Sequence, residues 1–191
     1  MIGVHEPLAL NVPGWTNSGP EHWQSRWERD HPSRFRRVEQ RDWDAPRPEE
    51  WVAALDSAIA SAGRPIVLVG HSLGAVTIAK WAEASLKGAA GRVWGALLVA
   101  PSDVERADAP DAIRCFAPMP RAALPFPAIL VASSDDPYTR LDRAREVAHR
   151  WGARLEVLPD AGHINTASGF GPFPDGERWL AELLAAGGEG A

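Results

Sequence analysis

Apolar runs alternate with segments of helical periodicity along almost the whole chain. Six short runs have the length and residue types of strands, and most are near-continuously apolar: residues 8–12, 35–40, 66–69, 93–100, 128–132 and 154–158. Five segments space their apolar residues as on one face of a helix: residues 21–30, 48–62, 75–86, 141–151 and 175–186. Apolar strands that alternate with helices indicate a parallel sheet with helices on both faces.

Residues 102–125 interrupt this alternation with prolines at positions 110, 118, 120 and 125. We expect irregular structure there, apart from a single turn near Val104, and no helical lid of several elements. The chain has no internal repeat, and 191 residues fit one domain. We therefore expect a single domain over residues 1–186 and a disordered tail over residues 187–191.

A serine stands between the third strand and the following helix, in the sequence Gly70-His71-Ser72-Leu73-Gly74. This G-x-S-x-G pattern is typical of a nucleophile elbow, a strained turn that lifts the serine hydroxyl clear of the backbone. Side chains at the two glycine positions would collide where strand and helix cross. A plain turn serine explains neither glycine, so the pattern favours Ser72 as a nucleophile. His71 is expected to point into the protein and pack there.

A serine hydroxyl needs a base to take its proton and an acid to orient that base. In enzymes built around such an elbow, the chain order is serine, acid, histidine. His163, in the loop after the sixth strand, is the candidate base. Asp136 follows the fifth strand and is the favoured acid, with Asp135 and Asp103 as alternatives. All of them follow strands, as Ser72 does, so we expect them at one edge of the sheet.

Acyl transfer also needs two backbone N–H donors aimed at the developing negative charge. The Leu73 amide is one candidate, and the Trp15 amide, with Gly14 beside it in the loop after the first strand, is the other. Without a lid, we expect a shallow cleft that holds a small acyl group but no fatty chain. Its expected borders are Gly14, Trp15, residues 102–125, Phe170 and Phe173.

Other reactive side chains have simpler interpretations. The aspartate pair has no nearby histidine, so we expect neither a metal site nor a cofactor. Trp23 and Trp27, four residues apart, are expected to pack on one helix face. The remaining histidines are expected to be structural or solvated: His5, His22, His31 and His149.

Composition narrows the class of partner and the location. A net charge of −5 gives no basic field for nucleic acid. Cys115 is the single cysteine, which excludes an internal disulfide framework and favours a reducing, cytoplasmic compartment. The N-terminal apolar run is too short for a signal peptide, and no stretch approaches the roughly 20 apolar residues of a membrane span. We therefore expect no membrane partner.

Taken together, these motifs resemble the small α/β-hydrolases related to retinoblastoma-binding protein nine, which include a bacterial branch of predicted serine hydrolases. The matching segments span nearly the whole chain: Pro13-Gly14-Trp15 with Ser18-Gly19-Pro20 and His22-Trp23; Gln40, Asp42-Trp43 and Pro46; Gly70-His71-Ser72-Leu73-Gly74; Val99-Ala100-Pro101; Ser133-Ser134-Asp135-Asp136-Pro137; and Gly162-His163-Ile164-Asn165 with Ser168-Gly169-Phe170-Gly171.

The resemblance implies a compact three-layer α/β-hydrolase fold that lacks the first two strands of larger members. It also implies a triad of Ser72, Asp136 and His163, without naming a substrate. We expect a six-stranded parallel sheet in the order 2-1-3-4-5-6 and a serine hydrolase that cleaves small esters or amides. The alternatives are a protein-binding module on a hydrolase scaffold, as the family's founding name indicates, or an acyltransferase or haloperoxidase with the same triad.

Overall fold

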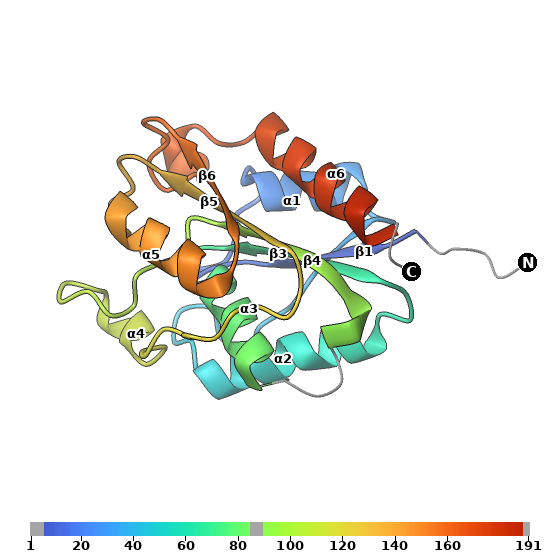
Figure 1. Ribbon diagram of the computed structural model, residues 1–191, viewed down its shortest axis with the longest axis horizontal. Coiled ribbons are helices and arrows are strands. Elements are labelled where there is room, and N and C mark those ends of the chain that lie inside the picture. Colours follow the sequence, from blue (N-terminus) through green and yellow to red (C-terminus); the bar gives the residue numbers. More distant parts are fainter. Residues whose placement is uncertain (1–5, 85–89, 189–191) are drawn as a thin grey trace, which may run out of the picture.

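The structure is a computed structural model, and it describes residues 6–84 and 90–188. Six strands form one sheet in the order β2-β1-β3-β4-β5-β6, and every neighbouring pair is parallel (Figure 1). The predicted strand order is confirmed. The strands are β1 (Leu8–Val12), β2 (Phe35–Arg37), β3 (Ile66–His71), β4 (Val93–Val99), β5 (Ala128–Ser133) and β6 (Arg154–Leu158).

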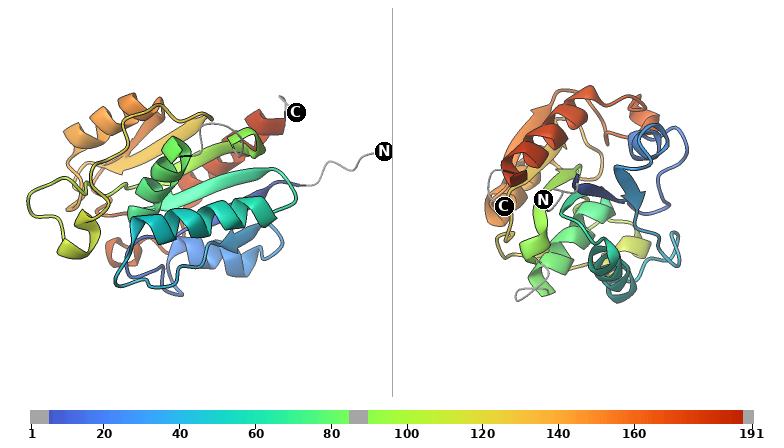
Figure 2. Two further views of the ribbon diagram at one scale, coloured as in Figure 1. Left: turned by 90° about the horizontal axis from the view of Figure 1, so that it is seen from below. Right: turned by 90° about the vertical axis from the view of Figure 1, so that its right-hand side faces the viewer.

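Helices cover both faces of the sheet (Figures 1 and 2). One face carries α1 (Trp23–Asp30) and α6 (Pro174–Gly188), and the other carries α2 (Pro48–Ser61), α3 (Leu73–Ala84) and α5 (Leu141–Trp151). Short 3₁₀ turns lie at Ala90–Arg92 and Thr166–Ser168. The architecture is therefore the three-layer arrangement expected from the sequence.

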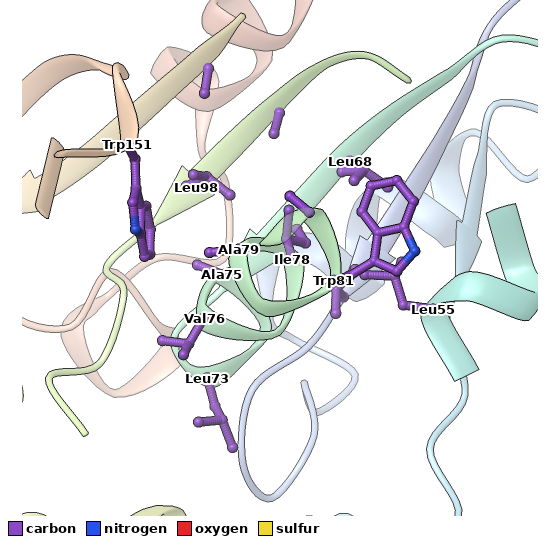
Figure 3. Packing of buried hydrophobic residues seen from close by; sticks show 14 of the residues in the cluster. Leu55, Leu68, Leu73, Ala75, Val76, Ile78, Ala79, Trp81, Leu98 and Trp151 are labelled. Atoms are coloured by element: carbon purple, nitrogen blue, oxygen red, sulfur yellow. The ribbon is translucent and has the colours of Figure 1, made fainter. Parts of the chain in front are cut away.

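The sheet divides the core into two apolar clusters. The larger one packs the sheet against α2, α3 and α5 around Trp51, Trp81 and Trp151, each about 1% exposed or less. Figure 3 shows part of this cluster, with Ile78 of α3 facing the sheet and Trp81 beside Leu55 of α2. The smaller one packs α1 and α6 onto the opposite face. Strand β3 is buried along its whole length between the two clusters, which fixes the elbow at its end.

Strand β2 is shorter than expected, because residues 38–40 are not part of it. The last ladder bond on this side runs from the Val38 amide to the Asn11 carbonyl at 2.8 Å. Strand β1 then ends at Val12, and Pro13 has no N–H to donate. The hydrogen bonds between β1 and β2 therefore end here, because β1 offers no further amide to pair with residues 38–40.

Several other elements differ from their expected ranges by one or two residues: β3 ends at His71, β4 at Val99, β5 at Ser133 and α2 at Ser61, while α1 begins at Trp23 and α3 at Leu73. Residues 85–86, expected in the helix that follows Ser72, lie outside the described residues.

A short helix, α4 (Asp111–Arg114), forms within the segment expected to be irregular, although the expected turn at Val104 is present. Pro110 precedes this helix, where its missing N–H costs nothing. Helix α6 continues to Gly188, two residues beyond its expected end, and residues 189–191 of the expected tail lie outside the described residues. Over the part of the chain that is described, no helix is both long and apolar enough to cross a membrane.

Candidate active site

The chain turns sharply from β3 into α3 at Ser72. Its φ of 56° is a left-handed value that costs a non-glycine residue free energy, as expected of an elbow. A Cβ added at Gly70 would lie 2.7 Å from the Cα of Ala75, and one added at Gly74 would lie 2.7 Å from the carbonyl oxygen of Pro13. The predicted collision between strand and helix is confirmed at Gly70, whereas a side chain at Gly74 would collide with the end of the neighbouring strand β1 and the residue after it. The Ser72 amide donates to the Val99 carbonyl at 2.9 Å, so β4 also holds the turn.

His163 lies between Ser72 and Asp136. Its Nε2 is 2.9 Å from the Ser72 Oγ, and its Nδ1 is 3.0 Å from each carboxylate oxygen of Asp136. The side chains of His163 and Asp136 are only 8% and 3% exposed, so water barely competes for these contacts. The Tyr138 amide donates to Asp136 Oδ1 at 2.8 Å and fixes the carboxylate. This geometry suits transfer of a proton from the serine to the imidazole.

The two other acid candidates have different partners. Asp135 Oδ1 accepts from the Ser133 hydroxyl at 2.6 Å and from the Gly162 amide at 2.8 Å. These bonds lower the pKa of the Asp135 carboxyl, the serine bond most. Asp103 lies 3.5 Å from the guanidinium of Arg143. Neither carboxylate contacts the imidazole, and Asp135 instead ties the loop after β5 to the loop after β6.

The backbone of His163 is held as firmly as its ring. Its amide donates to the Ser168 Oγ at 3.1 Å, and the His71 Nε2 bonds its carbonyl at 2.9 Å. A carbonyl oxygen only accepts, so His71 carries its hydrogen on Nε2. His71 is 5% exposed and packs its ring against the His163 ring, 4.9 Å between centroids. Its side chain therefore points into the protein, as expected.

The loop after β1 runs directly against the nucleophile. A Cβ at Gly14 would lie 2.8 Å from the Ser72 Cβ, so only glycine allows this approach. The Thr16 amide donates to the Trp43 carbonyl at 2.9 Å and holds the loop in place. Within the described ranges, neither the Trp15 amide nor the Leu73 amide has a hydrogen-bond partner. Both expected oxyanion donors are thus free.

A cavity of about 200 Å³ opens over the serine. The apolar side chains that line it are those of Trp15, Pro110, Ile113 and Tyr138. The polar residues that line it, besides Ser72, are Thr16, Asn17, His22, His71, Ser102, His163 and Asn165. Trp15 and residues 102–125 therefore border the cavity as expected.

Phe170 and Phe173, expected at the border, do not line the cavity. Phe173 is 1% exposed and lies in the smaller core cluster, 5.3 Å from the ring of Trp23 between centroids. Phe170 packs edge-on against Phe173. This expectation was wrong because aromatic burial against α1 outweighs exposure at the cleft. Tyr138, whose ring lies 4.5 Å from that of His163, is the aromatic residue that borders the site there.

His22 was expected to be structural or solvated, and the structure gives it a structural role at the cavity wall. Its Nδ1 accepts from the Gln24 amide at 3.2 Å and caps α1. Burial, followed by the Arg37 charge, lowers the pKa of His22 to about 3. Burial also holds the pKa of His71 well below its usual value. Both rings are therefore neutral near pH 7 and place no positive charge beside His163.

The residues that the structure describes do not form a metal-binding site. No group of three or more histidine, cysteine, aspartate or glutamate side chains there is arranged to hold an ion. What the arrangement offers is a serine, a base and an oriented acid beside one small cavity, with the Trp15 and Leu73 amides in the adjoining turns and without a partner among the described residues. These are the parts needed for nucleophilic acyl transfer.

The sequence matches a family model described as serine hydrolase over residues 9–182. No curated protein matches the chain. Among solved structures, a YdeN-like hydrolase from Pectobacterium atrosepticum is 32% identical, with a TM-score of 0.83 over 95% of this chain and 92% of that one.

Two more distant structures share the fold. The ydeN gene product of B. subtilis is 18% identical, with a TM-score of 0.72 over 94% of this chain and 99% of that one. Carboxylesterase CesB from Bacillus subtilis is 13% identical, with a TM-score of 0.59 over 93% of this chain and 83% of that one. The fold is thus that of α/β-hydrolases. Because the family model spans most of its length, the chain belongs to the serine hydrolase family.

Proposed function

We propose that the protein hydrolyses small carboxylic esters or amides through an acyl-enzyme formed on Ser72. The observation that carries this proposal is the continuous hydrogen-bonded line from Asp136 through His163 to Ser72, with contacts of 3.0 Å and 2.9 Å. Membership of the serine hydrolase family supports hydrolysis in general, and a carboxylesterase is among the neighbours of the same fold. The reaction uses no cofactor. The single cysteine, Cys115, favours a reducing, cytoplasmic location.

In the proposed reaction, Ser72 Oγ bonds to the substrate carbonyl carbon while its proton passes to His163 Nε2. The Asp136 carboxylate stabilises the resulting imidazolium, and the amides of Trp15 and Leu73 hold the oxyanion. The bond to the leaving group then breaks, and His163 gives the proton to the departing alcohol or amine. Water repeats the sequence on the acyl-enzyme and releases the acid.

Cavity size limits the acyl group. The cavity volume of about 200 Å³ is below the roughly 300–1,000 Å³ of pockets that hold drug-sized ligands. Its apolar wall consists of Trp15, Pro110, Ile113 and Tyr138. Such a wall removes water from a short or compact acyl group. A longer chain extends into solvent, and each methylene left in water forgoes about 0.8 kcal/mol of burial.

We therefore expect kcat/KM to be highest for acetyl to butyryl esters of a good leaving group and to rise no further with chain length. The measurement is kcat/KM over a series of p-nitrophenyl esters from acetyl to dodecanoyl. A value that still rises at dodecanoyl would refute a small open cleft and indicate an enclosed apolar channel.

A fluorophosphonate probe tests the proposed chemistry directly, because an activated serine attacks phosphorus as it attacks a carbonyl carbon. Mass spectrometry of the digested protein is expected to find the label on Ser72. Ser72→Ala is expected to abolish labelling while leaving the melting temperature within a few degrees of wild type.

Absence of labelling in the folded protein would sink the hydrolase proposal and favour a protein-binding module on the same scaffold. Labelling at a different serine would contradict the assigned nucleophile. If the label is on Ser72 but esters yield mainly transfer products when an alcohol is added, the enzyme is an acyltransferase instead.

A further inference from the structure

A second serine hydroxyl contacts the nucleophile. Ser102 follows β4 at the same edge of the sheet, and its Oγ is 2.8 Å from the Ser72 Oγ. Ser102 is 3% exposed and lines the cavity. Across the described residues, its hydroxyl has no other hydrogen-bond partner. Ser102 belongs neither to the proposed triad nor to the pair of proposed oxyanion donors.

The direction of this hydrogen bond follows from its neighbours. An ionised carboxylate only accepts, so Asp136 receives the hydrogen on His163 Nδ1. In the neutral ring, Nε2 then has a lone pair and accepts the hydroxyl hydrogen of Ser72. Ser72 has no second hydrogen to give. Ser102 must therefore be the donor in the contact between the two serines.

We propose that Ser102 is a catalytic residue whose hydroxyl donates to Ser72 Oγ and stabilises the negative charge that develops on that oxygen during acyl transfer. This inference rests on the proposed function, since it concerns the same nucleophile. It adds a donor on the nucleophile itself, distinct from the two amides assigned to the carbonyl oxygen of the substrate.

The backbone around Ser102 is built to hold this geometry. Ala100 has a φ of 48°, a left-handed value that costs an alanine free energy and turns the chain at the end of β4. The Thr139 hydroxyl donates to the Pro101 carbonyl at 2.6 Å and accepts from the Asp103 amide at 2.8 Å. Thr139 thus clamps the residues on both sides of Ser102. Strain of this kind is kept where it positions a functional group.

Charge develops on the Ser72 oxygen at two points of the reaction. During attack, its proton moves to His163 Nε2 while the bond from Oγ to the carbonyl carbon forms. During deacylation, the bond from that carbon to Oγ breaks, and the proton returns from Nε2 to Oγ. In both transition states, the bond from Ser102 goes to a more negative oxygen than in the resting enzyme. Hydrogen bonds to ionised acceptors are roughly twice as strong as neutral ones, so this donor favours the transition states.

The test compares wild type with Ser102→Ala, Ser102→Thr and Ser18→Ala. We expect Ser102→Ala to lower kcat for a p-nitrophenyl acetyl ester and the fluorophosphonate labelling rate by about 10-fold, with little change in KM or melting temperature. Ser102→Thr restores the donor and is expected to recover most of both rates. Ser18 is the matched control: it is 4% exposed, and its hydroxyl donates to Gln24 Oε1 at 2.7 Å, away from Ser72. Ser18→Ala is expected to keep wild-type rates.

Wild-type rates in Ser102→Ala would overturn this inference. Equal losses in Ser102→Ala and Ser102→Thr, with both proteins folded, would overturn it as well, because the hydroxyl would not be the cause. If the extra methyl of threonine destabilises the protein, Ser102→Cys takes its place, and its weak S–H donor is expected to give rates between alanine and wild type. A wild-type protein that neither labels nor turns over ester would refute the proposed function itself, which is a different result.

Discussion

Replacing Asp136 with asparagine is expected to lower kcat about 10⁴-fold and to leave the fold intact, as this change does in a Ser-His-Asp triad. The Tyr138 amide donates to Asp136 Oδ1 at 2.8 Å, so the oxygen of an asparagine is held at that position. Its NH₂ group then takes the place of Oδ2, 3.0 Å from His163 Nδ1. A donor there favours the tautomer with the hydrogen on Nε2, which cannot accept the proton of Ser72.

The neighbouring residue provides the matched control for this prediction. Asp135→Asn makes the same chemical change one position earlier. Its retained oxygen still accepts from the Ser133 hydroxyl and the Gly162 amide, since both contacts are made to Oδ1. We expect its kcat within a few-fold of wild type. The measurements are kcat on a short ester and the melting temperature of each variant. If Asp135→Asn loses most of its kcat while Asp136→Asn keeps it, Asp135 is the acid of the triad and the assignment is wrong by one residue.

The elements that local signals define were predicted to the residue. Strands β1 and β6 and helix α5 begin and end where the apolar runs and the flanking residues indicated. Helix α5 ends at Gly152, which has a φ of 66°, as a glycine C-cap does. The elbow was also located from a local signal, because strand, turn glycines and helix lie within one short stretch of sequence, although β3 extends to His71 and α3 begins at Leu73, each two residues closer to Ser72 than expected. These features depend on neighbours in the chain, so the chain alone reveals them.

The residues that the sequence left open depend on partners far away in the chain. Ser102 meets Ser72 across 30 positions, and no local pattern marks it apart from its place after a strand. Treating the polar residues after every strand as site candidates would have found Ser102, because the segments after β3, β4, β5 and β6 all contribute to the site. Phe173 is buried against Trp23 of α1, an outcome decided by how α1 and α6 meet. Asp135 and Asp136 differ only in which side of the loop each carboxylate faces.

Gly74→Ala is expected to lower the free energy of unfolding by about 4 kcal/mol, a shift of roughly 10 °C in melting temperature for a domain of this size. Gly74 is the second residue of α3, where intrinsic helix propensity alone favours alanine by about 1 kcal/mol. Packing acts in the opposite direction. A Cβ there would come within 2.7 Å of the Val12 carbonyl carbon and the Pro13 oxygen, and closer still to the Val12 oxygen.

This clash is with backbone, so no side-chain rotation relieves it. Helix α3 must move away from the end of β1, and that movement separates the loop containing Gly14 from Ser72. Ester turnover should therefore fall with stability. Gly91→Ala is the control, because a Cβ at this position meets nothing within 4 Å and its φ is not left-handed. We expect Gly91→Ala to change stability by less than about 0.5 kcal/mol in urea unfolding. Equal stabilities for the two variants would mean that helix and strand do not cross as closely as the elbow geometry requires.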